Sequence, residues 1–171
     1  SMNLARLLKP EHILLELGTT DVPEEERADL PRAQYVWQIK EAVLAELTDL
    51  VDRSGRVSNR NKLLQDLINR ERKATTGLSS GVAIPHVRTI YAKELLVGFA
   101  RSTPGVEFDC LDGQPAHLFF VMVAPPYDDT SYLRLYRQLA EAFSFRDYRE
   151  EFMTAQTEGE VLRLVKALGQ S

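Results

Sequence analysis

Hydrophobic residues recur along this chain at two different spacings. Between residues 32 and 53 the apolar positions follow steps of three and four, the spacing of one buried stripe on an α-helix. The stripe consists of Val36, Ile39, Val43, Leu44, Leu47, Leu50 and Val51. Further segments predicted to be helical are residues 61–72, 130–143, 147–154 and 161–168.

Shorter apolar runs predict strands between these helices. Residues 117–124 are apolar almost throughout, as expected of a strand covered on both faces. Residues 11–17, 82–84 and 94–101 are the other strand candidates. Because strands and helices alternate without a linker or an internal repeat, the sequence predicts one α/β domain over residues 1–171. Its helices would cover both faces of a central sheet.

Acidic residues, prolines and turn-forming residues interrupt the pattern at residues 18–31. Such a composition predicts an exposed loop with room for one helical turn. The net charge of the whole chain is −4 and no long basic run is present, which argues against nucleic acid as a partner. The single cysteine, Cys110, cannot form an internal disulfide and is interpreted as a buried apolar residue.

No apolar run approaches the roughly 20 residues that a membrane-spanning helix needs, so we expect no membrane insertion. The first residues also lack the apolar stretch and cleavage site of a signal peptide. The cytoplasm is therefore the expected location.

The segment from Arg70 to Arg88 carries the candidate chemistry. It contains a run rich in hydroxyl groups and glycine, Thr75 to Gly81, in which backbone N–H groups and hydroxyls could bind an anion. A short apolar run then leads to Pro85 and His86. Proline fixes its own φ and favours an extended residue before it, so His86 would stand on a stiffened backbone at a strand end.

A neutral imidazole is a good nucleophile near pH 7, and phosphoryl transfer needs little else except donors for the charge on the phosphoryl oxygens. The segment offers a catalytic His86 and candidate phosphoryl-binding groups on Arg70, Thr76, Ser79 and Ser80. No GxxxxGK[ST] motif is present, so we expect no nucleotide, no metal and no cofactor. Taken alone, the same residues also fit an ordinary turn beside a structural histidine.

The segment resembles the signature of the enzyme IIA family of the phosphotransferase system, of the fructose, mannitol and nitrogen-regulatory type (PTS EIIA type 2). The matching residues are Arg70-Glu71, Thr75-Thr76-Gly77, Gly81 and Ala83-Ile84-Pro85-His86, followed by residues 105–109, 112–115 and 124–125. The similarity is strong over 58–168 and looser before it, where 18–31 would be an acidic loop insertion.

The resemblance implies a fold and a function. The fold would be a mixed β-sheet flanked by helices on both faces. His86 would be phosphorylated, usually on Nε2, by the phosphocarrier protein HPr, with Arg70 near the phosphoryl group. The phosphoryl group would pass to a cysteine of a IIB domain or, in regulatory members, control a partner protein by binding.

One position departs from the family pattern. Where the family usually has a second active-site histidine, this chain has Tyr132. A phenol can donate a hydrogen bond, but it cannot act as an imidazole base at pH 7. The sequence therefore leaves two functions open: a carrier in sugar transport, or a regulatory module in which phosphorylation is a switch or has been lost. His12 and His117 are interpreted as structural, and Asp128-Asp129 as a charge match for a helix start.

Overall fold

Strand β5 (Ala116–Ala124) is the centre of the sheet, because every residue in it except His117 is buried. It pairs antiparallel with β4 (Leu96–Val106), and β4 pairs parallel with β1 (Ile13–Leu14). On its other side β5 pairs parallel with both β2 (Val82–Ala83) and β3 (His86–Arg88). This computed structural model, which describes residues 4–168, therefore contains a mixed sheet, as the family resemblance implied.

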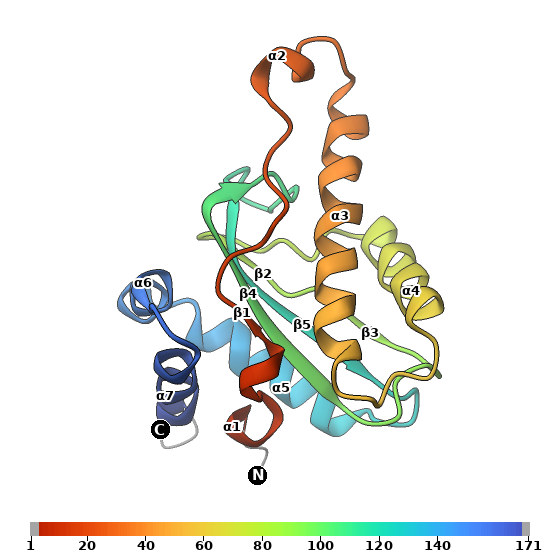
Figure 1. Cartoon of the computed structure of the whole chain (residues 1–171), viewed down its shortest axis with the longest axis vertical. Coiled ribbons are helices and arrows are strands. Elements are labelled where there is room, and N and C mark those ends of the chain that lie inside the picture. The colour runs from red at the N-terminus through yellow and green to blue at the C-terminus, as the bar shows by residue number, and fades with distance from the viewer. Residues whose placement is uncertain (1–3, 169–171) are drawn as a thin grey trace.

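Alternation along the strands divides the core into two layers. Phe119, Val121 and Val123 of β5 face one layer, whereas Leu118, Phe120 and Met122 face the other. Helices α3 (Arg32–Asp52) and α4 (Arg60–Lys73) cover the first layer. The second layer is covered by α1 (Leu4–Leu7), α5 (Thr130–Ala142), α6 (Arg146–Thr154) and α7 (Glu158–Leu168). Figure 1 shows these two groups of helices on opposite sides of the sheet.

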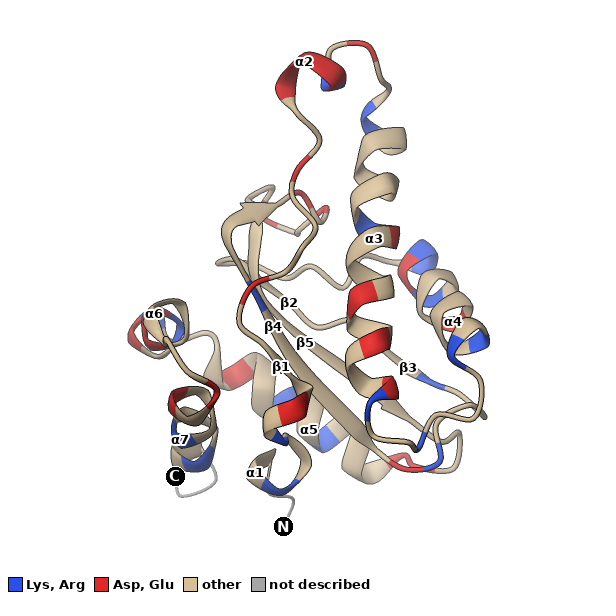
Figure 2. Ribbon diagram, in the orientation of Figure 1, with Lys and Arg blue, Asp and Glu red and all other residues tan. Residues whose placement is uncertain are grey.

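The segment at 18–31 contains the expected helical turn, α2 (Glu24–Arg27), at the tip of the molecule beside the start of α3 (Figure 1). Figure 2 shows the acidic residues gathered on α2, and none of its residues is buried. The prediction of an exposed acidic loop with one helical turn is confirmed.

Strands β1 and β4 differ most from their predicted bounds, and β3 was not predicted as a strand. Residues 10–12 form a short 3-10 turn, η1 (Pro10–His12), which leaves only Ile13 and Leu14 paired in β1. Strand β4 extends five residues beyond the predicted end at 101 and reaches Val106, because its register against β5 shifts between Arg101 and Val106. Pairing with β5 is interrupted over residues 102–105, which include Pro104, and resumes at Val106 opposite Ala116.

The helices agree closely with the hydrophobic pattern. The side chain of Asn59 accepts a hydrogen bond from the N–H of Lys62 and caps α4. Thr157 accepts one from Glu160 at the start of α7. Within residues 4–168 we find no helix whose length and hydrophobicity would allow it to span a bilayer.

Candidate functional site

His86 is the first residue of β3 and follows the gap between β2 and β3 at residues 84–85. Its backbone pairs with Met122 near the C-terminal end of β5, and its side chain is half-buried. The ring is therefore anchored by the sheet and still reaches solvent, as the sequence predicted for a residue placed by Pro85.

The two ring nitrogens of His86 have different neighbours. Nδ1 lies 2.5 Å from the carbonyl oxygen of Ile84, and Nε2 lies 3.5 Å from Nη2 of Arg70. Because a carbonyl oxygen can only accept a hydrogen bond, Nδ1 carries the proton in the neutral ring. Nε2 is then left with a lone pair that faces the guanidinium group.

Burial lowers the pKa of His86 below its ordinary value of 6.5, and the positive charge of Arg70 lowers it further. The hydrogen bond to the Ile84 carbonyl opposes this shift. The net direction keeps the imidazole neutral, and therefore nucleophilic, at neutral pH.

Arg70 lies at the last turn of α4, and its guanidinium group is itself held in place. Nη1 donates a hydrogen bond of 2.9 Å to the carbonyl oxygen of Ala74, directly after the helix. The other end of the fork, Nη2, is the end that faces His86. A fixed cation at this position can meet negative charge that develops on a group attached to Nε2.

Two tyrosines of α5 border the ring of His86. The ring centroid of Tyr136 lies 4.7 Å from that of His86, and the centroid of Tyr132 lies 5.9 Å from it. Burial raises the pKa of Tyr132 to about 12, so its phenol stays protonated and can only be a hydrogen-bond donor or acceptor at neutral pH. The guanidinium carbon of Arg88 lies 5.7 Å from the centre of the Tyr132 ring.

Arg88 follows His86 by two residues on β3 and therefore points to the same side of the strand. Its guanidinium group forms an ion pair with Asp129, the residue before α5. This contact ties β3 to the start of the helix that carries both tyrosines. The prediction that Asp128-Asp129 serves a helix start agrees with Tyr132, whose N–H donates to Asp128 Oδ1.

The run Thr75 to Gly81 is a hairpin that folds back along β2. The N–H of Leu78 donates to Val82, and the N–H of Ile84 donates to Thr76. The turn requires left-handed backbone at Ser80 and Gly81, with φ of 61° and 81°. The hydroxyl-rich segment thus points along the sheet and not across the face of the imidazole.

This geometry separates the predicted phosphoryl-binding hydroxyls from the ring. Ser79 and Ser80 lie at the hairpin turn, where the N–H of Ser80 bonds to Asp112. That turn adjoins the Leu118 end of β5, and at about 3.3 Å per residue the four-residue step to Met122, opposite His86, is roughly 13 Å. The hydroxyl of Thr76 is buried and hydrogen-bonds to Glu71. Of the predicted site residues, the structure brings together Arg70, His86 and Tyr132.

Sequence reasoning did not single out Tyr136 or Lys40 as parts of this region. Both belong to helices distant in sequence from His86, and their positions follow only from the packing of α5 and α3. His12 is buried, and its ring nitrogens have no hydrogen-bond partner among the residues that the structure describes. His117 is half-buried, with Nδ1 at 3.1 Å from the Ser102 carbonyl oxygen. Among the described residues no group of three or more His, Cys, Asp or Glu side chains could hold a metal ion.

Comparison with known families is decisive for the class of protein. The family described as "Phosphoenolpyruvate-dependent sugar phosphotransferase system, EIIA 2" matches residues 29–168. The chain belongs to this family. Its members are components of a phosphotransferase system, which agrees with the resemblance found in residues 58–168.

EIIA relatives of both the sugar-specific and the regulatory kind match this chain. A PTS system fructose-specific EIIA component of Haloferax volcanii is 36% identical and aligns over 69% of this chain and 77% of the relative. A nitrogen regulatory protein of Pseudomonas aeruginosa is 30% identical over 74% of this chain and 82% of its own length. A fructose-specific EIIABC component of Bacillus subtilis is also 30% identical, but the matched region spans only 20% of that longer protein.

Solved structures of EIIA proteins have the same fold. The crystal structure of nitrogen regulatory protein IIA-Ntr from Neisseria meningitidis has a TM-score of 0.78 at 28% identity, covering 95% of this chain and 98% of that one. Enzyme IIAMTL of Escherichia coli, solved in complex with phosphorylated enzyme IIBMTL, has a TM-score of 0.69 at 19% identity, covering 94% and 99%. The α/β architecture with a central mixed sheet is thus the fold of the EIIA family.

Proposed function

We propose that His86 accepts a phosphoryl group on Nε2 from the phosphohistidine of HPr and passes it to a cysteine of a IIB domain. The observation that carries this proposal is the orientation of the ring. The carbonyl of Ile84 fixes the proton on Nδ1, and the lone pair of Nε2 faces Arg70 at the surface of an EIIA fold. The IIA–IIB complex of a structural relative supports a IIB domain as the acceptor, and membership of the EIIA family supports a role in phosphoryl transfer.

The proposed step exchanges one phosphorus–nitrogen bond for another. The lone pair of His86 Nε2 forms a bond to phosphorus while the bond in the donor breaks, and the donor imidazole keeps that electron pair. Arg70 meets the charge on the phosphoryl oxygens, and the phenol of Tyr132 is a second donor at the same ring. Because the donor phosphohistidine is itself a high-energy species, the exchange needs no nucleotide. The hydroxyls of Thr76, Ser79 and Ser80 have no part in this proposal.

The test is phosphorylation of the purified chain by phosphoenolpyruvate, enzyme I and HPr. Intact-mass measurement should show one acid-labile phosphoryl group on the native chain and none on His86→Ala. His117→Ala is the matched control, because it also removes an imidazole, from the opposite end of β5, and should be labelled like the native chain. Native protein that takes no label, or His86→Ala that keeps it, would contradict the proposal.

A second candidate function is a regulatory switch, which Tyr132 favours. The phenol occupies the place of the family's second histidine beside His86 and cannot shuttle a proton at neutral pH. A phosphoryl group adds close to two negative charges and could control binding to a regulated protein. Phosphorylated chain that never transfers its label to a IIB domain would favour the switch over the carrier. The cytoplasmic location stays a prediction of the sequence.

A further inference from the structure

A buried ion pair lies between the two helices that cover this side of the sheet. Nζ of Lys40, on α3, is 2.8 Å from Oε2 of Glu71, on α4, and the two side chains are only 2% and 1% exposed. Taking two charges out of water is costly unless their remaining hydrogen-bonding capacity is also used. The other partners of this pair therefore indicate what it does.

Nζ of Lys40 also lies over the rings of Phe108 and Trp37, at 4.9 and 5.4 Å from their centroids. Within residues 4–168, the further hydrogen-bond partners of the pair are in the first arm of the hairpin. Glu71 accepts hydrogen bonds from both the N–H and the hydroxyl of Thr76, the first of them at 2.7 Å. Lys40 donates to the hydroxyl of Thr75 at 3.1 Å. The pair thus fixes two consecutive residues of the hairpin arm, Thr75 and Thr76, against the helices.

Two carbonyl groups that orient the site adjoin this arm: Ile84 lies opposite Thr76 across the hairpin, and Ala74 directly precedes Thr75. The carbonyl of Thr76 accepts a 3.0 Å hydrogen bond from the N–H of Ile84, and the carbonyl of Ile84 in turn accepts from Nδ1 of His86. The carbonyl of Ala74, directly before Thr75, accepts from Arg70. Each orienting carbonyl is therefore linked to the buried pair through a short path of backbone and hydrogen bonds.

We propose that Lys40 and Glu71 position the site: the buried pair holds the hairpin arm so that the carbonyls of Ile84 and Ala74 orient the His86 ring and the Arg70 guanidinium. Lys40 and Glu71 are positioning residues, since neither contacts the ring. This inference rests on the proposed function in that the oriented ring is the one that accepts the phosphoryl group.

Loss of Lys40 leaves the Glu71 carboxylate buried without its counter-charge. The carboxylate must then take up a proton or move toward water, and in either case its hydrogen bonds to Thr76 are weakened or lost. The arm is freed, the Ile84 carbonyl shifts, and the proton on His86 can move from Nδ1 to Nε2. A ring protonated on Nε2 has no lone pair for phosphorus at that atom.

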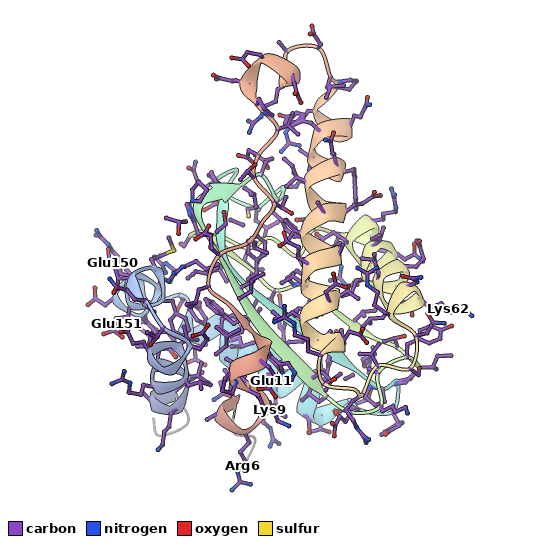
Figure 3. All side chains as sticks on the ribbon, in the orientation of Figure 1. Arg6, Lys9, Glu11, Lys62, Glu150 and Glu151 are labelled. Atoms are coloured by element: carbon purple, nitrogen blue, oxygen red, sulfur yellow. The ribbon has the colours of Figure 1, made fainter. Side chains whose placement is uncertain are left out.

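The experiment compares Lys40→Met with Lys62→Met in the full chain. Lys62 is on α4, the helix that carries Arg70 and Glu71, and its exposed side chain lies at the outside of that helix, with Nζ over the ring of Tyr91 (Figure 3). The control therefore makes the same substitution without touching the pair. Nitrogen NMR of the unphosphorylated protein reports the tautomer of His86. Quenched-flow labelling with phospho-HPr reports the rate of phosphorylation.

We expect Lys40→Met to reduce the Nδ1-protonated fraction of His86 and to slow phosphorylation about tenfold or more, while Lys62→Met changes neither. The double variant Lys40→Met/Glu71→Gln should recover much of both properties, because an uncharged glutamine amide at that position can stay buried and accept from Thr76. A variant of the core, Val43→Ala on the same helix, should lower stability without changing the tautomer.

A folded Lys40→Met protein with the native tautomer and the native rate would overturn the proposal. If that variant does not fold, Thr76→Val tests the same chain of bonds with both charges kept, and a native tautomer there overturns it equally. The tautomer is measured without phosphorylation, so native protein that fails to accept a phosphoryl group would refute the proposed function while this inference is still decided by NMR.

Discussion

His86 shows how one side chain is tuned by its immediate neighbours. Burial and the charge of Arg70 lower its pKa below 6.5, so the reactive neutral ring persists into mildly acidic solution. We expect the rate of phosphoryl acceptance to be flat from pH 8 to about 6.5 and to fall only as the pH drops through the lowered pKa. A pH–rate profile with phospho-HPr, together with an NMR titration of the ring, measures this. A ring that titrates above 6.5 would refute it.

Tyr132 should decide how the phosphorylated ring behaves. It is 5% exposed, and its phenol stays protonated at neutral pH because burial raises its pKa to about 12. In Tyr132→His a titratable imidazole would stand beside the His86 ring, at the position where the family resemblance implies a second histidine. We expect faster transfer of the phosphoryl group to a IIB domain in this variant, by about tenfold, because an imidazole can exchange protons near pH 7.

Tyr132→Phe is the companion variant, since it keeps the ring and removes the hydroxyl. It should slow phosphorylation of His86 by roughly the cost of one hydrogen bond to a charged group, about tenfold. Rates measured by intact mass for both variants check the pair of expectations. Equal rates in native, His and Phe forms would show that the phenol has no contact with the phosphoryl group.

The sequence could predict that Arg70 and His86 lie together, because both belong to one short segment. Arg70 and His86 are separated by one hairpin, and the match to a known motif identified both. The hydroxyls of Thr76, Ser79 and Ser80 looked equally suitable because composition does not reveal which way a hairpin runs. At the turn of the hairpin the N–H of Ser80 donates to Asp112, and the hydroxyl of Thr76 donates to the buried carboxylate of Glu71.

At the scale of elements, one buried arginine, Arg101, connects two strands and a helix. Arg101, on β4, donates to the carbonyl of Leu15 after β1 and to the carbonyls of Phe152 and Ala155 at the end of α6. It thereby satisfies carbonyls that the end of a helix leaves without partners and adds a cation where the helix dipole is negative. A single side chain joins β1, β4 and α6.

We expect Arg101→Met to lower the free energy of unfolding by about 2–3 kcal/mol, since buried carbonyls lose their donors while the aliphatic volume is kept. Arg163→Met, on the exposed side of α7, is the control and should change stability by less than about 0.5 kcal/mol. Urea denaturation of both variants measures the difference. A loss for Arg101→Met as small as that of the control would show that water replaces the guanidinium group.

Long elements were predictable from the sequence, whereas short ones were not. The apolar stripe of α3 spans about four and a half turns and determines both the type of the element and its buried face. The long apolar run of β5 likewise determines that it is a strand buried on both faces. By contrast η1, β1 and β3 have two or three residues each, too few for a period to appear. Their structure is set by pairing with β4 and β5, which is information from distant parts of the chain.

At the scale of the whole molecule, the sheet separates two apolar layers that share their strands. Leu47 of α3 is fully buried in one layer and Leu139 of α5 in the other. Truncation of either to alanine should cost about 2–5 kcal/mol. Because the two residues share no layer, we expect the losses to add to within about 0.5 kcal/mol in the double variant, with one cooperative transition. Denaturant titrations of the three variants check this, and two separate transitions would contradict it.

The strands at both edges of the sheet are short. At one edge, β1 has only two residues. At the other edge, β2 and β3 follow each other along β5 and are interrupted at Ile84 and Pro85, where proline has no N–H to donate. The first arm of the hairpin also pairs with this edge through a β-bridge between Gly77 and Ala83. Long unpaired edge strands are templates on which separate molecules pair and aggregate. The same proline that sets the backbone before His86 therefore also protects concentrated protein from edge-to-edge association.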